Sequence, residues 1–91
     1  MMPLFAVICR DKPNHLQTRM ETRERHLAYL AETGVVQFAG PFIEGGSPIG
    51  SLLVVEAENR EAAGAWTAKD PYTQAGLFAS VEVIEWRKVI G

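Results

Sequence analysis

Two residues far apart in the sequence could act together as an acid–base pair. His26 lies in a predicted amphipathic helix, and Asp70 comes much later, directly before Pro71. A histidine changes charge near neutral pH, which suits proton transfer, and a carboxylate can orient its ring. The pattern also allows two plainer interpretations. His26 could be a histidine at the edge of the core, and Asp70 could cap a short helix that begins at Pro71.

Arg23 and Ser51 are candidates for binding a substrate. Arg23 precedes His26 by three residues, so their side chains are neighbours on one helix face. It falls near the middle of the apolar stripe, with Arg19 beside it, where a guanidinium needs water or an anion. A snorkelling side chain or a structural ion pair would also explain Arg23. Ser51 opens a predicted strand outside any G-x-S-x-G motif, so it is a candidate for hydrogen bonding rather than a nucleophile.

No metal or cofactor site is indicated by the sequence. The chain has one cysteine, Cys9, and two histidines, His15 and His26, and these do not form a zinc pattern. The glycines within residues 44–50 join two predicted strands, whereas a phosphate-binding loop would open a helix. We therefore expect no metal and no cofactor, and the lone thiol suggests the reducing cytoplasm.

The composition narrows the class of protein. The chain has 91 residues and a formal net charge of -2, so it lacks the basic surface that binds nucleic acid or anionic membranes. No apolar run approaches the roughly 20 residues that span a bilayer, and the N-terminal run is too short for a signal peptide. We expect a single domain over residues 1–91 that binds a small molecule rather than nucleic acid or a membrane.

The first half of the chain predicts a strand followed by a long helix. Residues 4–9 are continuously apolar and are ended by residues 10–13, which bring charge and a proline. An amphipathic helix follows over residues 14–33, with Gly34 as its C-cap. Its apolar stripe, which we expect to face the core, is made of Leu16, Met20, Leu27, Leu30 and Ala31.

A hairpin is predicted next. Its first strand begins at residues 35–38, and the sequence Ala-Gly-Pro at residues 39–41 is expected to break or bulge it. Residues 44–48 form the turn, and residues 50–57 form the second strand.

The last part of the chain predicts a helix and a strand. Asn59 can cap the helix, which ends near Asp70 because the residue before a proline is pushed out of helical geometry. The expected apolar face of this helix consists of Ala62, Ala65 and Trp66, with Ala63 as a further candidate. The final strand is expected over residues 80–90.

The order βαββαβ predicts an α+β, ferredoxin-like fold. Its antiparallel sheet has the first and third strands at the centre and both helices on one face. Both faces of the first strand are apolar, with Leu4, Ala6 and Ile8 opposite residues 5, 7 and 9. Helices can cover only one face, so we predict a homodimer that packs open face against open face. The alternative is that the C-terminal tail or the loop of the second strand covers it.

Several short motifs occur in a fixed order. They are R-E-R-H-L-A-Y-L (Arg23 to Leu30), A-G-P (39–41), G-S (Gly50 and Ser51), E-A-A-G-A-W (61–66) and D-P-Y-T-Q-A-G-L (Asp70 to Leu77). In this order the chain resembles the YCII-related (YciI-like) family over nearly its whole length. The most specific part is R-x-x-H followed, at this distance, by D-P-Y-x-x-A-G-L.

The resemblance implies a fold, an assembly and a site. It implies a ferredoxin-like domain that forms a dimeric α+β barrel, with a histidine and an aspartate proposed as the active-site pair. His26 and Asp70 stand at the matching positions, and Arg23 and Ser51 match residues near the same pocket. The family is similar in fold to muconolactone isomerases, and one branch includes a dehydrochlorinase of a chlorinated hydroxyquinol. The short segment 43–49 lacks the longer insertion of some relatives, which leaves the lid and the substrate open.

Two functions of different classes remain open from the sequence. In the first, the chain is a small cofactor-independent lyase or isomerase in which His26 moves a proton on a small polar metabolite. Asp70 would orient His26 and stabilise its imidazolium, while Arg23 binds an anionic group and Ser51 donates a hydrogen bond. In the second, the chain is a non-catalytic ligand-binding or accessory module. A pocket at His26, with Asp70 within hydrogen-bond reach, would favour the enzyme.

Overall fold

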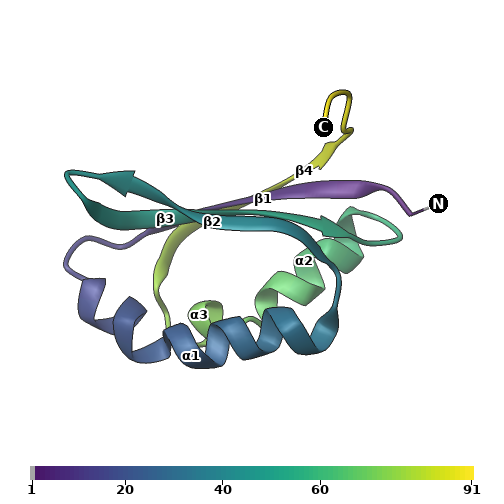
Figure 1. The fold of residues 1–91 in the computed structure, drawn as a ribbon. Helices are drawn as coiled ribbons and strands as arrows, with labels where there is room; N and C mark the ends of the chain where they lie inside the picture. Colours follow the sequence, from purple (N-terminus) through teal and green to yellow (C-terminus); the bar gives the residue numbers. More distant parts are fainter. Residues whose placement is uncertain (1) are drawn as a thin grey trace.

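A four-stranded antiparallel sheet has helices on one of its faces (Figure 1). The computed structural model describes residues 2–91. The elements, in chain order, are β1 (Leu4–Asp11), α1 (Leu16–Thr33), β2 (Val36–Glu44), β3 (Ser47–Glu56), α2 (Arg60–Ala68), α3 (Pro71–Gln74) and β4 (Phe78–Trp86). The strands lie in the order β2-β3-β1-β4 across the sheet. This confirms the ferredoxin-like fold, with the first and third strands at the centre.

The hydrophobic core lies between the helices and the two central strands. Phe5, Val7 and Cys9 of β1 are buried on this face, because every second side chain of a strand points to the same side. Their cross-strand partners on β3 include Leu53, and Ala63 of α2 packs against the same cluster. We call this side of the sheet the covered face and the other side the open face.

The C-cap of α1 is confirmed, but the prediction for its apolar stripe is only partly right: Leu30 packs against the core, whereas most of the stripe is exposed. Gly34 has φ 66°, the left-handed geometry that glycine adopts easily, and its N–H bonds to a carbonyl of the last turn. The buried residues of α1 are Arg19, Thr22 and His26, while Arg23 is exposed together with most of the apolar stripe. A helical wheel finds the apolar row, yet polar side chains can be buried as well where hydrogen bonds satisfy them.

The predicted break in the second strand is also wrong. β2 runs through residues 39–41 without interruption, and its register against β3 shifts at Val36/Phe38 and Phe42/Ile43 instead. Pro41 is tolerated because β2 is an edge strand, where an amide on the outer side needs no partner strand.

The hairpin turn is shorter than predicted. Gly45 and Gly46 have φ of 56° and 80°, the pair of positive values that a two-residue hairpin turn requires. β3 therefore begins at Ser47 rather than at Gly50, and Pro48 lies inside the strand.

The cap of α2 is confirmed, whereas the prediction of its buried face is only partly right. The side chain of Asn59 accepts a hydrogen bond from the Ala62 N–H at 2.8 Å. Ala63 and Thr67 are buried and Trp66 packs against the core, as predicted for Ala63 and Trp66, whereas Ala62 and Ala65 are exposed. Thr67 can be buried because its hydroxyl donates to the Ala63 carbonyl at 2.9 Å. Hydropathy alone did not predict a buried threonine at this position.

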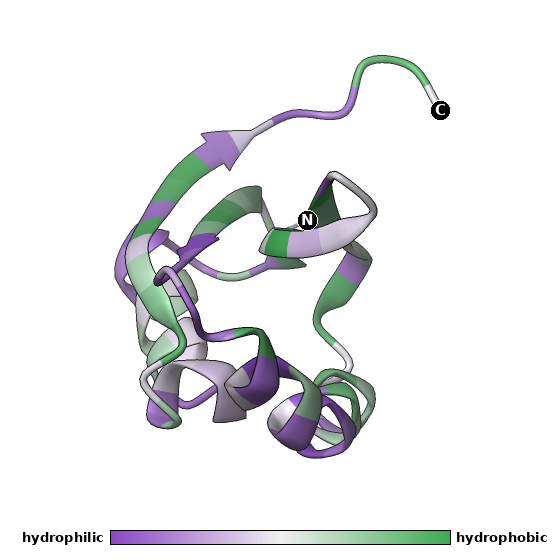
Figure 2. Cartoon of the chain, turned by 90° about the vertical axis from the view of Figure 1, so that its left-hand side faces the viewer, coloured by the Kyte–Doolittle hydropathy of each residue, from purple (hydrophilic) through white to green (hydrophobic). Residues whose placement is uncertain are grey.

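The open face of the sheet carries large apolar side chains that remain exposed. Phe38, Ile84 and Trp86 are 50%, 49% and 38% exposed, and in Figure 2 hydrophobic and hydrophilic residues alternate along β4, the strand that leads to the C-terminus. The rings of Phe38 and Trp86 meet edge to face, and Lys88 Nζ lies 5.4 Å from the Phe38 ring centroid. Lys88 in the C-terminal segment thus contacts the open face at Phe38, whose side chain remains half exposed.

Candidate active site

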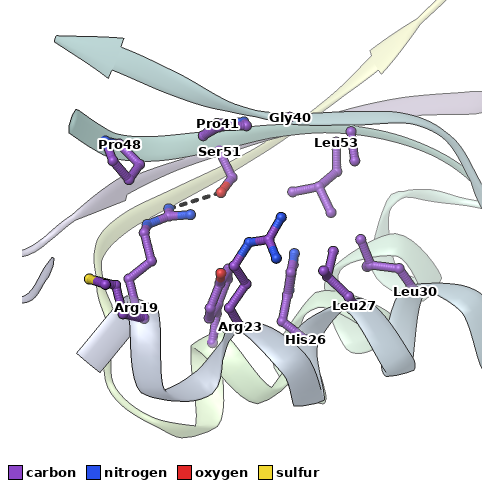
Figure 3. A pocket seen from close by; sticks show the side chains of 13 residues that line it. Arg19, Arg23, His26, Leu27, Leu30, Gly40, Pro41, Pro48, Ser51 and Leu53 are labelled. Atoms are coloured by element: carbon purple, nitrogen blue, oxygen red, sulfur yellow. Dashed lines mark hydrogen bonds between the residues drawn. The ribbon is translucent and has the colours of Figure 1, made fainter. Parts of the chain in front are cut away.

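A pocket of about 240 Å³ lies between α1 and the β2–β3 side of the sheet (Figure 3). This volume is below the range of drug-sized pockets, so the pocket suits a small metabolite. The lining residues come from α1 (Arg19, Met20, Arg23, His26, Leu27, Leu30), β2 (Ala39, Gly40, Pro41), β3 (Pro48, Ser51, Leu53) and α3 (Tyr72). The pocket therefore has apolar walls with a few polar groups, the general composition of small-molecule sites.

His26 and Asp70 are in direct contact. Nδ1 of His26 lies 2.8 Å from Oδ1 of Asp70, which also accepts the backbone N–H of Tyr72 at 2.9 Å. An ionised carboxylate can only accept, so Nδ1 donates and the neutral ring carries its lone pair on Nε2. His26 lines the pocket and points into it from α1 (Figure 3), whereas Asp70 does not line it. The pocket is thus presented with Nε2 as a proton acceptor.

The position of Asp70 follows from the local sequence. Pro71 occupies the first position of α3, and Asp70 has extended backbone angles, φ -62° and ψ 131°, which suit the residue before a proline and a helix cap. The Asp70 carboxylate, 1% exposed, bonds both to the backbone at the start of α3 and to His26 of α1. The cap and the partnership with histidine, which the sequence left as alternatives, occur together.

Tyr72 packs between two polar side chains of α1. Its ring stacks on His26 with centroids 3.9 Å apart and an interplanar angle of 14°. Cζ of Arg19 lies 4.8 Å from the Tyr72 ring centroid, and it must lie on the other face because His26 occupies the first. Burial raises the pKa of the Tyr72 phenol, although the charges of Arg19 and Arg23 act in the opposite direction. Tyr72 therefore stays protonated at neutral pH and fixes the plane of the His26 ring.

Arg19 connects the end of β1 with Ser51. Its Nε and Nη2 donate to the Asp11 carboxylate at 2.7 and 2.9 Å, and Nη2 also donates to Ser51 Oγ at 2.9 Å. Burial alone would lower the pKa of Arg19, but the hydrogen bond and the charge of Asp11 outweigh it, so the pKa lies above its ordinary value. Arg19 is therefore a permanent cation fixed beneath the sheet.

Arg23 differs from Arg19 in having a free guanidinium. It lines the pocket and extends toward its centre between Arg19 and His26 (Figure 3). Within residues 2–91 no hydrogen bond or ion pair to Arg23 is formed. It is available to a ligand in a way that Arg19 is not.

The four residues singled out from the sequence lie close together, and sequence reasoning missed three others. His26, Arg23 and Ser51 line one pocket, and Asp70 contacts His26 from behind. The three others are Asp11 and Tyr72, together with Arg19, which the sequence placed beside Arg23 without assigning it a role. Arg19 could have been found, since it precedes Arg23 by four and His26 by seven residues, which places all three on one helix face. Asp11 gave no such signal, because it reads as part of a charged turn.

Cys9 lies beside the site without the properties of a nucleophile. It is fully buried and pairs with Ser51 across β1 and β3. Burial, followed by the nearby charge of Asp70, raises the pKa of the Cys9 thiol to about 12. The thiol is therefore an unreactive core group at physiological pH.

Two kinds of feature are not found in the described part of the chain. Across residues 2–91, no three His, Cys, Asp or Glu side chains are grouped closely enough to bind a metal ion. None of the helices in that range is both long and apolar enough to cross a membrane.

Comparison with known sequences identifies relatives over nearly the full length. The sequence profile of the YCII-related domain matches residues 3–87. An uncharacterised protein of Haemophilus influenzae is 36% identical over 95 residues, which cover 93% of this chain and 97% of that protein. Protein YciI of Escherichia coli is 34% identical over 96 residues, which cover 94% and 98%.

Comparison with solved structures identifies a relative with a described activity. The fold matches 5-chloro-2-hydroxyhydroquinone dehydrochlorinase (TftG) from Burkholderia phenoliruptrix, solved in complex with 2,5-dihydroxybenzoquinone, with a TM-score of 0.86. The two chains are 35% identical, and the match covers 92% of this chain and 93% of the other. An antibiotic biosynthesis monooxygenase matches with a TM-score of 0.60 at 13% identity, which indicates a shared fold alone.

Proposed function

The chain belongs to the YCII-related domain family, and we propose that it is a small cofactor-independent enzyme of the lyase or isomerase type. One observation carries the proposal: His26 presents Nε2 to a pocket while Asp70 binds Nδ1 at 2.8 Å. The similarity to a dehydrochlorinase supports an enzyme over a binding module. The substrate is a small polar metabolite, because the pocket is small and combines apolar walls with a free arginine.

In this mechanism His26 is the general base and later the general acid. Its Nε2 lone pair takes a proton from the substrate, and the imidazolium that forms is stabilised by the Asp70 carboxylate. In an isomerisation the proton returns to a different atom of the substrate. In an elimination, the electron pair left by the proton forms a double bond and expels an anionic leaving group with its own electron pair. Arg23 neutralises negative charge in either case.

The test compares catalysis with binding in matched variants. Dehydrochlorination of 5-chloro-2-hydroxyhydroquinone, the reaction named for the relative, is the first assay, followed by a panel of small lactones and hydroxylated rings. His26→Gln is expected to lower kcat by about 100-fold or more, the usual contribution of general acid–base catalysis. The variant should still bind ligand in the pocket. The control is His15→Gln, since His15 bonds to the Pro13 carbonyl outside the pocket and its loss should leave kcat unchanged.

The outcomes separate the enzyme from the alternative. A His26→Gln protein with kcat near the wild-type value would contradict the proposal. A wild-type protein that binds 2,5-dihydroxybenzoquinone but turns over no member of the panel would favour the non-catalytic ligand-binding or accessory module.

We further propose that the enzyme works as a homodimer joined through the open face. Phe38, Ile84 and Trp86 form an exposed apolar surface on that face, and apolar surface of this kind on a soluble chain usually marks a contact site. The lone buried thiol, Cys9, is compatible with the reducing cytoplasm, where we place the enzyme.

A further inference from the structure

The side chain of Ser51 is fixed in one hydrogen-bonding role by its surroundings. Nη2 of Arg19 lies 2.9 Å from Ser51 Oγ. A guanidinium has only donors, so Ser51 must accept this bond, and its own hydrogen has to be donated elsewhere. Within residues 2–91 the Ser51 hydroxyl donates to no protein acceptor, and its side chain lines the pocket. The hydrogen of Ser51 is therefore left for a ligand.

Asp11 is what prevents Arg19 from moving. The carboxylate accepts from Nε and Nη2 of Arg19 in a forked geometry, and the two side chains are 8% and 6% exposed. Paired bonds of this kind define both position and direction. The ring of Tyr72, 4.8 Å from Cζ, packs against the guanidinium. These contacts hold the Arg19 guanidinium in the orientation in which Nη2 donates to Ser51. The charge of Arg19 also makes the Ser51 hydroxyl a stronger donor.

The donor Ser51 and the base His26 approach the pocket from opposite sides, and Arg23 extends into the space between them from α1. Ser51 projects from β3 in the sheet, whereas His26 and Arg23 project from α1 (Figure 3). A small molecule between them would contact a proton acceptor at one atom and hydrogen-bond donors at another. Such a division suits a substrate in which loss of a proton at one atom places negative charge on another.

From this geometry we propose that Ser51 and Arg23 form an oxyanion subsite, and that Asp11 and Arg19 are positioning residues that keep Ser51 as its donor. The inference rests on the proposed function and names its substrate class: compounds with an acidic C–H next to a carbonyl group. His26 Nε2 forms a bond to the proton as the C–H bond breaks. The C–H electron pair becomes a carbon–carbon double bond, and the carbonyl π pair moves to oxygen. The resulting negative oxygen accepts from the Ser51 O–H and from Arg23.

The first experiment is a double-mutant cycle on turnover. Ser51→Ala is expected to lower kcat about 100-fold with little change in KM, the usual cost of losing one oxyanion donor. Arg19→Lys keeps the charge but loses the fork, and it should lower kcat to a similar extent. The double variant should be no worse than either single variant, because both changes remove the same hydrogen bond. Arg25→Lys, at an exposed position of α1 outside the pocket, is the control and should behave as wild type.

A merely structural role for the Arg19–Asp11 pair predicts a different result. Arg19→Lys would then lower the melting temperature without lowering kcat in the folded protein, and its effect would add to that of Ser51→Ala. Ser51→Ala and Asp11→Asn keep the proposal falsifiable if Arg19→Lys does not fold. Additive effects, or an unchanged kcat in folded Ser51→Ala, would overturn it.

The second experiment measures binding and does not depend on turnover. The probes are 2,5-dihydroxybenzoquinone, which has carbonyl and acidic hydroxyl oxygens, and hydroquinone, which has neutral phenols of similar size. Wild type should prefer 2,5-dihydroxybenzoquinone by about tenfold or more, and Ser51→Ala should lose most of this preference. His26→Gln should retain it. If preference is retained in His26→Gln while no turnover is found, the subsite stands and the proposed function fails. If turnover is found but Ser51→Ala changes neither kcat nor the preference for 2,5-dihydroxybenzoquinone, the proposed function stands and the oxyanion subsite fails.

Discussion

The covered and open faces of the sheet differ in which polar and apolar side chains they bury. On β3, three consecutive residues illustrate this: Ser51 is 4% exposed, Leu52 is 37% exposed and Leu53 is 1% exposed. The covered face buries a serine because Arg19 satisfies its hydroxyl, and the open face leaves a leucine partly exposed. Burial in this sheet therefore depends on whether a partner covers or satisfies a side chain, and not on hydropathy alone.

The difference between the two faces suits them to different kinds of binding. The covered face combines a tight core with two hydrogen-bonded polar groups, Asp11–Arg19–Ser51 and His26–Asp70. The open face exposes the apolar side chains of Phe38, Ile84 and Trp86, with the charged residues Glu56 and Glu82 on the same side of the sheet. A surface with paired, directed polar groups can discriminate a ligand, and a surface of exposed apolar groups can bind another protein surface.

The largest expected effect is on the free energy of unfolding, when neighbouring leucines on the two faces are replaced. Leu53→Ala should lower the free energy of unfolding by about 2–5 kcal/mol, because it opens a cavity in a packed core. Leu52→Ala should cost less than about 1 kcal/mol in the monomer, because its side chain is already partly in water. Urea unfolding followed by tryptophan fluorescence, at concentrations where the protein is monomeric, measures both. Equal losses would mean that the two faces are packed alike.

The next effect concerns association through the open face. Ile84→Lys should weaken the proposed homodimer by about 100-fold or more, since a symmetric interface would bury the new charge twice. Ligand binding in the pocket should be unchanged, because Ile84 does not line it. Sedimentation equilibrium gives the dissociation constant. Gln17→Lys adds the same charge on exposed α1 and is the control. A dimer that Ile84→Lys leaves intact would have to use another surface.

A third effect concerns the close approach of the central strands. A Cβ on Gly50 would press against the backbone carbonyl of Cys9 on β1, so Gly50→Ala should cost about 1–3 kcal/mol of stability. It should also disturb ligand binding, because Ser51 is the next residue. Gly64→Ala on α2 is the matched control, since a Cβ there meets nothing within 4 Å and alanine favours the helix. Thermal unfolding of both variants is the measurement, and similar melting temperatures would contradict the close approach.

The smallest expected effect depends on the exclusion of water from the Cys9 thiol on the covered face. Because the pKa of Cys9 is raised from 9.0 to about 12 in the folded state, the unfolded chain loses this proton first as pH rises. The unfolded state then binds fewer protons, so this contribution to stability is fully present below pH 9 and is lost between pH 9 and about 12. Between pH 8 and 10, wild type should lose about 1 kcal/mol more stability than Cys9→Ala.

Denaturant titrations of both proteins across this pH range give the comparison. Parallel pH profiles for wild type and Cys9→Ala would show that water reaches the thiol. A native protein that reacts quickly with a thiol reagent at pH 8 would lead to the same conclusion.

Local features were predictable wherever a backbone rule acts over a few residues. Asn59 and Gly34 cap their helices as expected, and the Asp70–Pro71 step ends α2 and begins α3. The βαββαβ order and the central position of β1 were predictable too, because apolar periodicity reports how each element is buried. The course of β2 through Pro41 was not, since it depends on β2 lying at an edge of the sheet.

The sequence by itself therefore determined the fold, the caps and the family, together with the four residues His26, Asp70, Arg23 and Ser51 as candidates. Tertiary structure decided how the two arginines divide their roles. Arg19 and Arg23 are chemically identical and share a helix face, but the Asp11 carboxylate, at the shift in register that ends β1, reaches only Arg19. A charge bonded by a buried carboxylate positions its neighbours, and a charge without such a partner remains available to a ligand. Which of the two becomes which depends on a contact between distant elements, and no local pattern encodes it.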